Sequence, residues 1–225
     1  NTHKIPTSNT VNGRSVYYWK NRANDRVPSD AGEVILTNCS KITVENQDIN
    51  DGSVGILLGY SDNILMKNNE LTENNYYGIY LWHSDSNRID NNQLENNKYT
   101  GIELTRSDDN MIEDNIVLNR EHEYGISTGI DLIDSHNTTI KNCIIKENDE
   151  GIEIENSNHS LIKSNEISSN IFSGIFARTC ENNTIIKNTV IHTEDKGIYF
   201  GPNTENNSIY MNNFIDNRDD PKDKG

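Results

Sequence analysis

The chain has 225 residues and a formal net charge of −15, and Leu, Ile, Val and Phe together supply only 23% of it. Ala occurs three times and Asn 37 times, so the best helix former is nearly missing while residues that tolerate turns are abundant. This composition excludes a helical bundle. The acidic balance argues against a nucleic-acid-binding protein, and the lack of a long apolar run predicts no insertion into a membrane.

Residues 1–32 are expected to form an N-terminal cap or a partial coil. The segment Val11-Asn12-Gly13 followed by Val16-Tyr17-Tyr18-Trp19 is typical of a hairpin or the start of a coil. Its aromatic side chains would cover the open end of a stack of strands, which would otherwise template aggregation. No segment at Asn1 resembles a signal peptide, so we expect a mature chain or an excised fragment.

Residues 33–217 form a repeat array. The dipeptide Gly-Ile recurs at spacings of 23, 23, 28, 22, 23 and 23 residues. The copies that carry this period begin at Gly55, Gly78, Gly101, Gly129, Gly151, Gly174 and Gly197. A further repeat without the Gly begins near Glu33.

Each repeat contains three short strand signals. The first is Gly-Ile-x-Leu, the second surrounds positions such as Ile89 and Ile112, and the third surrounds positions such as Leu71 and Leu94. Alternation of period two predicts strands, and no segment has helical periodicity. Leucine-rich repeats would need helix-compatible stretches, and left-handed β-helices have a shorter period. The predicted fold is therefore all-β, a single-stranded right-handed parallel β-helix of about eight coils of 22–24 residues.

Asn residues recur five positions apart in most repeats. The pairs are Asn63 and Asn68, Asn87 and Asn92, Asn110 and Asn115, Asn137 and Asn142, Asn183 and Asn188, and Asn207 and Asn212. Identical amides stacked one coil above another can form hydrogen-bonded ladders and can accept left-handed turns, so we expect a structural role. Cys39 and Cys180 fall where other coils have Ser, and an odd number of Cys residues gives no disulfide framework.

The array is expected to end near Asn217, and residues 218–225 are expected to be a polar tail or a linker. This segment, Arg218 to Gly225, is short and mostly charged.

The sequence resembles the NosD-like, CASH-type β-helix repeat proteins of archaeal and bacterial cell surfaces. The resemblance rests on Asn9–Trp19, on Gly32–Cys39, and on the recurring Gly-Ile-x-Leu and Asn-x-Ile-x-x-Asn motifs. Members of this group are described as carbohydrate-binding proteins and sugar hydrolases, and NosD itself is linked to copper delivery for nitrous oxide reductase. The resemblance implies an extracellular, cell-surface or periplasmic protein whose partner is a polysaccharide or a cell-envelope glycan.

Stacking the repeats predicts a functional column on the outward face of the first strand. The column contains Tyr80, Glu103, Asp131, Glu153, Phe176 and Tyr199, and a parallel column contains Trp82, Glu155 and Arg178. Carboxylates in three consecutive coils with aromatic residues on either side are typical of a sugar cleft. Glu103, Asp131 and Glu153 are therefore candidate catalytic residues, and at least one should have a raised pKa. Coil spacings of ~4.8 Å and about 10 Å fit both retaining and inverting glycosidases.

The 28-residue repeat adds a loop at Asn119–Thr128, which carries Arg120, Glu121, His122, Glu123 and Tyr124 directly before Asp131. Insertions in solenoids often build the functional face. His83, Arg106 and Asp134, at the strand ends, are candidates for the rim of the same site.

Metal sites are weaker alternatives. Ca²⁺ could relieve repulsion among the stacked carboxylates, because it prefers oxygen ligands. Asp109, His136 and His159 precede Asn or Ser markers, and they would hold a transition metal if the two His residues lay one coil apart. No Met or Cys joins them, so a copper site would lack soft ligands.

Three functions remain open from the sequence. The first is a polysaccharide-binding surface module, and the second is a glycosidase, lyase or epimerase in which Asp131 is the central acid or base. A lyase or epimerase would need a cation for the uronate carboxylate, for which Arg106, Arg178, His83 and His122 are the candidates. The third is a purely structural surface or adhesion module, as part of a larger cell-envelope protein.

Overall fold

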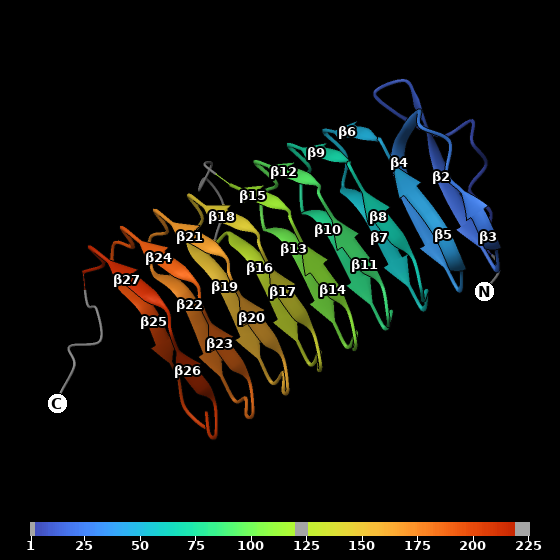
Figure 1. Ribbon diagram of the computed structural model, residues 1–225. Helices are drawn as coiled ribbons and strands as arrows, with labels where there is room; N and C mark the ends of the chain where they lie inside the picture. The colour runs from blue at the N-terminus through green and yellow to red at the C-terminus, as the bar shows by residue number, and fades with distance from the viewer. Residues whose placement is uncertain (1–2, 120–125, 219–225) are drawn as a thin grey trace, which may run out of the picture.

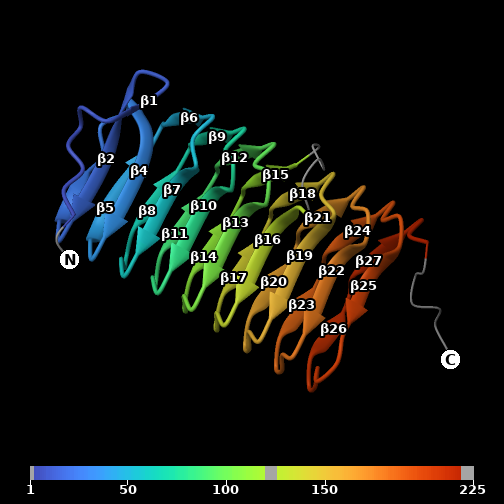
Figure 2. The same cartoon turned by 180° about the vertical axis from the view of Figure 1, so that it is seen from behind.

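The computed structural model describes residues 3–119 and 126–218, which form a stack of short parallel strands (Figure 1, Figure 2). Across these residues there is no helix, and thus none long and apolar enough to cross a bilayer. The chain turns through three strands and returns one step further along the axis, so that equivalent strands of successive repeats lie side by side. The expected parallel β-solenoid is confirmed, with eight coils of three strands after a partial first coil in the described part of the chain.

Three sheets, here called A, B and C, run along the stack. Sheet A contains β1 (Thr10–Val11), β2 (Arg14–Lys20), β4 (Ala31–Thr37), β7 (Val54–Gly59), β10 (Tyr77–Trp82), β13 (Thr100–Thr105), β16 (Thr128–Ile133), β19 (Glu150–Glu155), β22 (Ser173–Arg178) and β25 (Lys196–Phe200). Sheet B contains β3 (Ala23–Arg26), β5 (Ser40–Glu45), β8 (Leu65–Lys67), β11 (Arg88–Asp90), β14 (Met111–Glu113), β17 (Thr139–Lys141), β20 (Leu161–Lys163), β23 (Thr184–Ile186) and β26 (Ser208–Tyr210). Sheet C contains β6 (Asp48–Asn50), β9 (Glu70–Thr72), β12 (Gln93–Glu95), β15 (Ile116–Leu118), β18 (Ile144–Lys146), β21 (Glu166–Ser168), β24 (Thr189–Ile191) and β27 (Asn213–Ile215).

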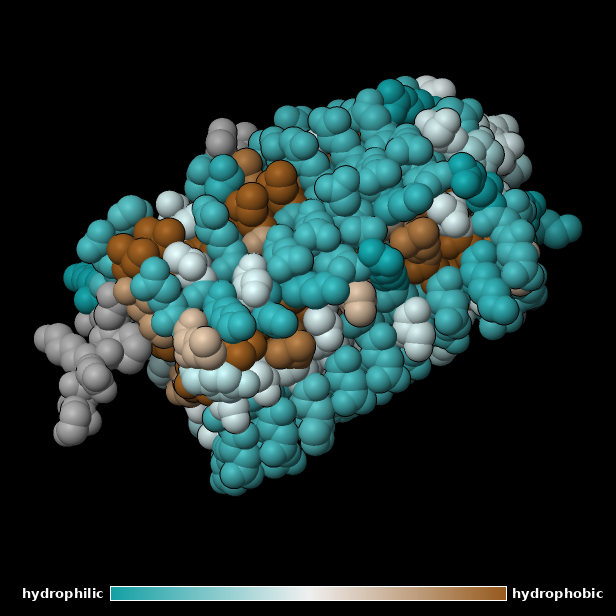
Figure 3. All heavy atoms as spheres, viewed as in Figure 1, coloured by the Kyte–Doolittle hydropathy of each residue, from teal (hydrophilic) through white to brown (hydrophobic). Residues whose placement is uncertain are grey.

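The narrow core explains how so few apolar residues suffice. In each coil the Gly-Ile-x-Leu strand turns its Ile and Leu inward, as Ile102 and Leu104 do, and both are fully buried. Sheets B and C each add one central residue per coil, such as Ile112 and Val117. Outward positions are polar for the most part, and Figure 3 shows a mainly hydrophilic face with separate hydrophobic patches. Each coil therefore needs only about four large apolar side chains to continue the core.

The marker Gly lets the coils close. A Cβ on Gly129 would lie 2.5 Å from Cγ2 of Ile145 and 2.6 Å from the carbonyl oxygen of Gly151. Real Cβ atoms do not approach other atoms so closely, so sheet C can pack against the start of sheet A only where a side chain is missing. The Gly-Ile period thus records a steric requirement of the coil.

Asn ladders line the turns between sheets, as expected. Asn92 donates from its side-chain amide to the backbone carbonyl of Met66 and to Oδ1 of Asn115, while its own Oδ1 accepts from the amides of Asn69. A ladder of Ser hydroxyls runs along another turn, and Cys39 and Cys180 are buried at its positions. These bonds satisfy the buried backbone groups of every turn that they line.

Two of the predicted Asn pairs are one residue out of register. Asn63, Asn68, Asn137 and Asn142 occupy exposed positions with φ between 54° and 57°. Ladder positions after Asn137 and Asn142 are instead taken by Thr138 and Cys143, whose backbone amides bond to the next coil. The left-handed turn position and the ladder position directly after it both favour Asn. The sequence alone therefore does not show which of the two positions a given Asn occupies.

The N-terminal strands form a hairpin followed by a coil of two strands. β1 pairs with β2 in antiparallel orientation, and all other strand pairings in the described ranges are parallel. Tyr17 and Trp19 of β2 lie over Val34 and Leu36 of the next coil and cover the end of the core.

Candidate functional site

The predicted outward column exists on sheet A. Its strand register pairs Tyr80 with Glu103, Glu103 with Asp131, and Asp131 with Glu153. The register then continues to Phe176 and Tyr199. Parallel strands lie ~4.8 Å apart, so three carboxylates of one column occupy successive steps of the solenoid.

A pocket of about 320 Å³ opens over these carboxylates. Its walls are Tyr77, Tyr99, Thr100, Glu103, Ile126, Thr128, Asp131, Glu150, Glu153, Phe176 and Arg178. Three predicted carboxylates, Phe176 and Arg178 are thus brought together in one place. Ile126 and Thr128 close the pocket at the end of the inserted loop, whose residues 120–125, including His122, lie outside the described residues.

Asp131 and Glu103 are the two most buried carboxylates of the pocket, each with only 9% of its surface exposed. Oδ1 of Asp131 has no hydrogen-bond partner. Burial raises the pKa of this carboxyl well above its ordinary value, and the neighbouring carboxylates of Glu153 and Glu103 raise it further. Such a group is disposed either to hold a proton or to accept hydrogen bonds from a ligand.

Glu103 and Tyr77 form the wall on one side of Asp131. The hydroxyl of Thr105 donates to Oε1 of Glu103 at 3.2 Å. Burial raises the pKa of Glu103, while hydrogen bonds from Thr105, Thr100 and Tyr77 oppose that rise. Burial together with the charge of Glu103 raises the pKa of Tyr77 to about 12, so its hydroxyl remains a donor at physiological pH.

Arg178 forms the opposite wall together with two carboxylates. Its Nη2 lies 3.1 Å from Oε1 of Glu153 and 2.7 Å from Oε2 of Glu155. The guanidinium also lies 5.6 Å from the ring centroid of Phe176. Burial raises the pKa of Glu153, and Arg178 opposes the rise. Nη2 of Arg178 is therefore engaged by both carboxylates, whereas its buried Nε has no hydrogen-bond partner.

Glu150 is a pocket residue that the sequence did not point to. It lies in a second outward column with Tyr77, Thr100 and Thr128, directly before each marker Gly. The Gly and the Ile that follow it are both buried, which interrupts the alternation of inward and outward residues. Counting by twos from the Ile therefore does not identify the residue before the Gly as outward-facing. Burial raises the pKa of Glu150 to about 7, and its Oε2 has no hydrogen-bond partner.

Two predicted aromatic residues flank the pocket from outside. Tyr80 stacks on Tyr77 with ring centroids 4.9 Å apart, and Tyr199 stacks on Phe176 at 5.3 Å. They extend the apolar surface of the pocket along the solenoid axis in both directions.

Trp82 and His83 belong to a different cluster, at the end of β10. The His83 ring stacks on Tyr60 at 5.2 Å, and Trp82 meets both rings edge to face. Neither residue lines the acidic pocket. In the same turn, Nε of Arg106 lies 3.5 Å from Oδ2 of Asp134, so these two rim candidates bind each other, and Oδ1 of Asp134 accepts a hydrogen bond from the side-chain amide of Asn156.

The proposed transition-metal column does not form. Asp109, Asn137 and His159 occupy equivalent turn positions in successive coils, with φ of 58°, 54° and 60°. His136 lies one residue before this position. Nδ1 of His136 accepts a hydrogen bond from the backbone amide of Asn158. The prediction failed because Asn137 takes the turn position, which moves His136 back by one residue. In residues 3–119 and 126–218, His, Cys, Asp and Glu side chains form no group of three or more that could hold a metal ion.

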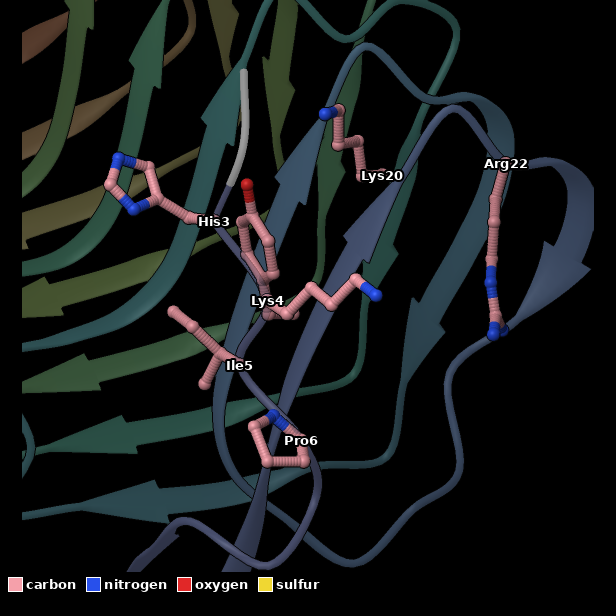
Figure 4. A pocket seen from close by; sticks show the side chains of 7 residues that line it. His3, Lys4, Ile5, Pro6, Lys20 and Arg22 are labelled. Carbon is pink, nitrogen blue, oxygen red and sulfur yellow. The ribbon is translucent and has the colours of Figure 1, made fainter.

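A larger pocket, of about 660 Å³, lies at the N-terminal end (Figure 4). It is lined by His3, Lys4, Ile5, Pro6, Tyr18, Lys20 and Arg22. It contains no carboxylate, so its charge is opposite to that of the pocket around Asp131.

These features define a class of protein: a parallel β-solenoid with an acidic, aromatic-flanked pocket on one sheet. The profile of the NosD family, described as periplasmic copper-binding protein, matches residues 4–128 and 124–225. The chain therefore belongs to the NosD family. The described residues do not fit a copper site, because the three Cys residues are buried apart from one another and no metal-binding group is assembled.

Solved structures with the same fold include three polysaccharide enzymes. A periplasmic alginate epimerase, AlgG T265N mutant, has a TM-score of 0.71 and 17% identity over 80% of this chain and 47% of its own. An alginate lyase from Paenibacillus sp. str. FPU-7 has a TM-score of 0.62 and 15% identity over 89% and 87%. Pectate lyase Pel9A has a TM-score of 0.59 and 15% identity over 92% and 72%.

These identities show a shared fold alone, and the chain spans about half the length of the epimerase. None of the curated protein sequences compared with the chain matches it.

Proposed function

We propose that this chain binds polysaccharide along the outer face of sheet A, with the pocket around Asp131 at the centre of the binding surface. The observation that carries the proposal is one pocket that combines stacked carboxylates with aromatic rings. Carboxylates accept hydrogen bonds from sugar hydroxyls, and aromatic faces pack against the apolar faces of sugar rings.

The direction of the site supports a chain-like ligand. Stacked aromatic pairs, Tyr77 with Tyr80 and Phe176 with Tyr199, lie on the two sides of the carboxylates along the solenoid axis. A polymer that follows this axis would contact an aromatic pair before and after the acidic pocket.

The family and the similar structures support the same class of ligand. The similar structures include an alginate epimerase, an alginate lyase and a pectate lyase. The description of the NosD family as periplasmic supports an extracytoplasmic location, in the periplasm or at the cell surface.

Binding to a panel of oligosaccharides, measured by calorimetry, tests the proposal. At least one oligosaccharide should bind, and Asp131→Asn should weaken that binding at least tenfold. Glu166→Gln removes one negative charge from an exposed position of sheet C and should leave binding unchanged. Equal binding by Asp131→Asn and the unaltered protein would place the ligand elsewhere.

A second candidate is a sugar-processing enzyme, favoured by the raised pKa of the buried Asp131 carboxyl. A carboxyl that keeps its proton near neutral pH can act as a general acid toward a glycosidic oxygen. Product formation from a bound oligosaccharide, lost in Asp131→Asn, would support a glycosidase, lyase or epimerase. Binding without product supports the module, and neither binding nor product leaves a structural surface or adhesion role, as part of a larger protein. Calorimetric titration with Ca²⁺ tests whether that ion joins the carboxylates.

A further inference from the structure

The charge around the pocket is strongly one-sided. Four carboxylates line the pocket, namely Glu103, Asp131, Glu150 and Glu153. A fifth, Glu155, lies beside them and forms an ion pair with Arg178. Arg178 is the sole Arg or Lys among the described lining residues, and its Nη2 already binds two of the carboxylates, while its buried Nε has no hydrogen-bond partner. A sugar that brought a carboxylate of its own would meet repulsion from these groups, because the one cation beside them is outnumbered by the carboxylates around it.

Two buried acceptor atoms in this pocket have no donor. Oδ1 of Asp131 and Oε2 of Glu150 are both shielded from solvent and lack a hydrogen-bond partner, and Asp131 is more than nine-tenths buried. Buried polar atoms are normally paired, so unpaired ones in a pocket indicate a ligand that supplies donors. An ammonium group has three N–H donors and no acceptor, and its charge also offsets the repulsion between the carboxylates.

Apolar walls complete the requirements for a sugar ring. Tyr77 and Phe176 line the pocket beside the carboxylates, and Tyr77 keeps its hydroxyl as a donor within the wall. A pyranose could place its apolar face against one ring while a substituent reaches Asp131. At about 320 Å³ the pocket is at the small end of ligand sites, which suits a short segment of a chain.

We propose that the pocket around Asp131 selects a sugar unit with a free amino group, so that the ligand is a polysaccharide of amino sugars and not a polyuronate. This inference rests on the proposed polysaccharide binding and specifies its substrate class. It distinguishes the chain from the similar alginate epimerase, alginate lyase and pectate lyase, with which it shares only the fold.

Three hexasaccharides of equal length test the inference by calorimetry at pH 6.5: glucosamine, N-acetylglucosamine and galacturonate. The glucosamine hexamer should bind at least tenfold more tightly than the acetylated one, and galacturonate should not displace it. Raising the ionic strength from 50 to 500 mM should weaken the binding of glucosamine, because the recognition depends on charge. Glu103→Gln and Asp131→Asn should each weaken it at least tenfold, while the exposed control Glu166→Gln should not.

The outcomes separate this inference from the proposed function. If the acetylated hexamer binds as tightly as glucosamine, or if galacturonate displaces glucosamine, polysaccharide binding stands and amine selection is overturned. If none of the three hexamers binds, amine selection is overturned, and the wider panel of oligosaccharides decides whether polysaccharide binding stands. Galacturonate could also bind the basic pocket at the N-terminal end. Competition with glucosamine excludes that contribution, because only a ligand that shares the glucosamine site displaces it.

Discussion

Asp131 pairs in strand register with Glu153, yet Arg178 binds Glu153 at 3.1 Å and leaves Oδ1 of Asp131 buried without a hydrogen-bond partner. Like charges at adjacent steps of a sheet oppose folding, and a single cation placed to one side relieves only part of that cost. Such an arrangement is typical of a site kept for function at the expense of stability.

Replacing Asp131 by Asn should therefore stabilise the protein while it removes sugar binding. Above the ordinary pKa of an Asp, the folded chain must either bury a charge or keep a proton that the unfolded chain releases, and Asn requires neither. We expect the free energy of unfolding at pH 8 to rise by about 1–2 kcal/mol, which corresponds to roughly 2–4 °C in Tm per kcal/mol for a protein of this size. Thermal unfolding of Asp131→Asn beside Glu166→Gln measures this, and a lower Tm for Asp131→Asn would contradict it.

Glu150 should make the stability fall between about pH 4.5 and pH 7. Burial raises its pKa from 4.5 to about 7, so the folded state holds a proton that the unfolded state loses over this range. A raised carboxyl pKa contributes stability that is complete below the unfolded pKa and is lost as the pH rises through the folded value. The raised pKa of Asp131 acts in the same direction.

Thermal unfolding of the unaltered protein and of Glu150→Gln, followed from pH 5 to pH 8, checks this expectation. The fall in Tm should be smaller in the variant, because an amide does not titrate. Parallel pH profiles for the two proteins would show that Glu150 makes no contribution.

The sequence predicted the fold and the central column because both depend on the repeat. Gly-Ile fixes which residues of successive coils share a level, so Glu103, Asp131 and Glu153 could be stacked by counting. Counting failed where a repeat varies in length or composition. Thr138 and Cys143 replace Asn in the ladders, which concealed that Asn137 and Asn142 lie in the turns.

Glu150 and Tyr77 escaped prediction for another physical reason. A strand alternates its side chains, but the first strand of each coil begins with two consecutive buried residues, Gly and Ile. The residue before that pair points outward together with the third residue after it. The Gly is buried because a Cβ at its position would clash with the neighbouring coil. That clash depends on how the coils pack, so the pattern within one strand does not predict it.

Substituting the marker Gly should be far more damaging than substituting a strand Gly whose added Cβ would meet open space. In Gly129→Ala, the new Cβ would meet the β-branched side chain of Ile145 and the backbone of Gly151, neither of which can move without separating two sheets. We expect a loss of about 3 kcal/mol or more in the free energy of unfolding. In Gly59→Ala, the Cβ would meet nothing within 4 Å, so the change should be within about 1 kcal/mol.

Urea unfolding of the two variants measures the difference. Similar midpoints for Gly129→Ala and Gly59→Ala would mean that the marker Gly has no steric role in the coil.

A ladder Asn should likewise contribute more than the Asn beside it in the sequence. Asn92 is buried, and its removal in Asn92→Ala leaves the backbone carbonyl of Met66 and the amides of Asn69 without their side-chain partner. Each buried group left unpaired costs about 1–3 kcal/mol, so the loss should reach about 3–5 kcal/mol.

Asn91→Ala is the matched control. Asn91 lies in the exposed turn with φ of 52°, and its side chain binds only Oδ1 of Asn68 at the surface. The substitution loses the tolerance of Asn for a left-handed backbone, at a cost of about 1–2 kcal/mol. In chemical unfolding, the free energy of unfolding of Asn92→Ala should therefore be well below that of Asn91→Ala. The reverse order would show that turn conformation, and not the buried amide ladder, holds successive coils together.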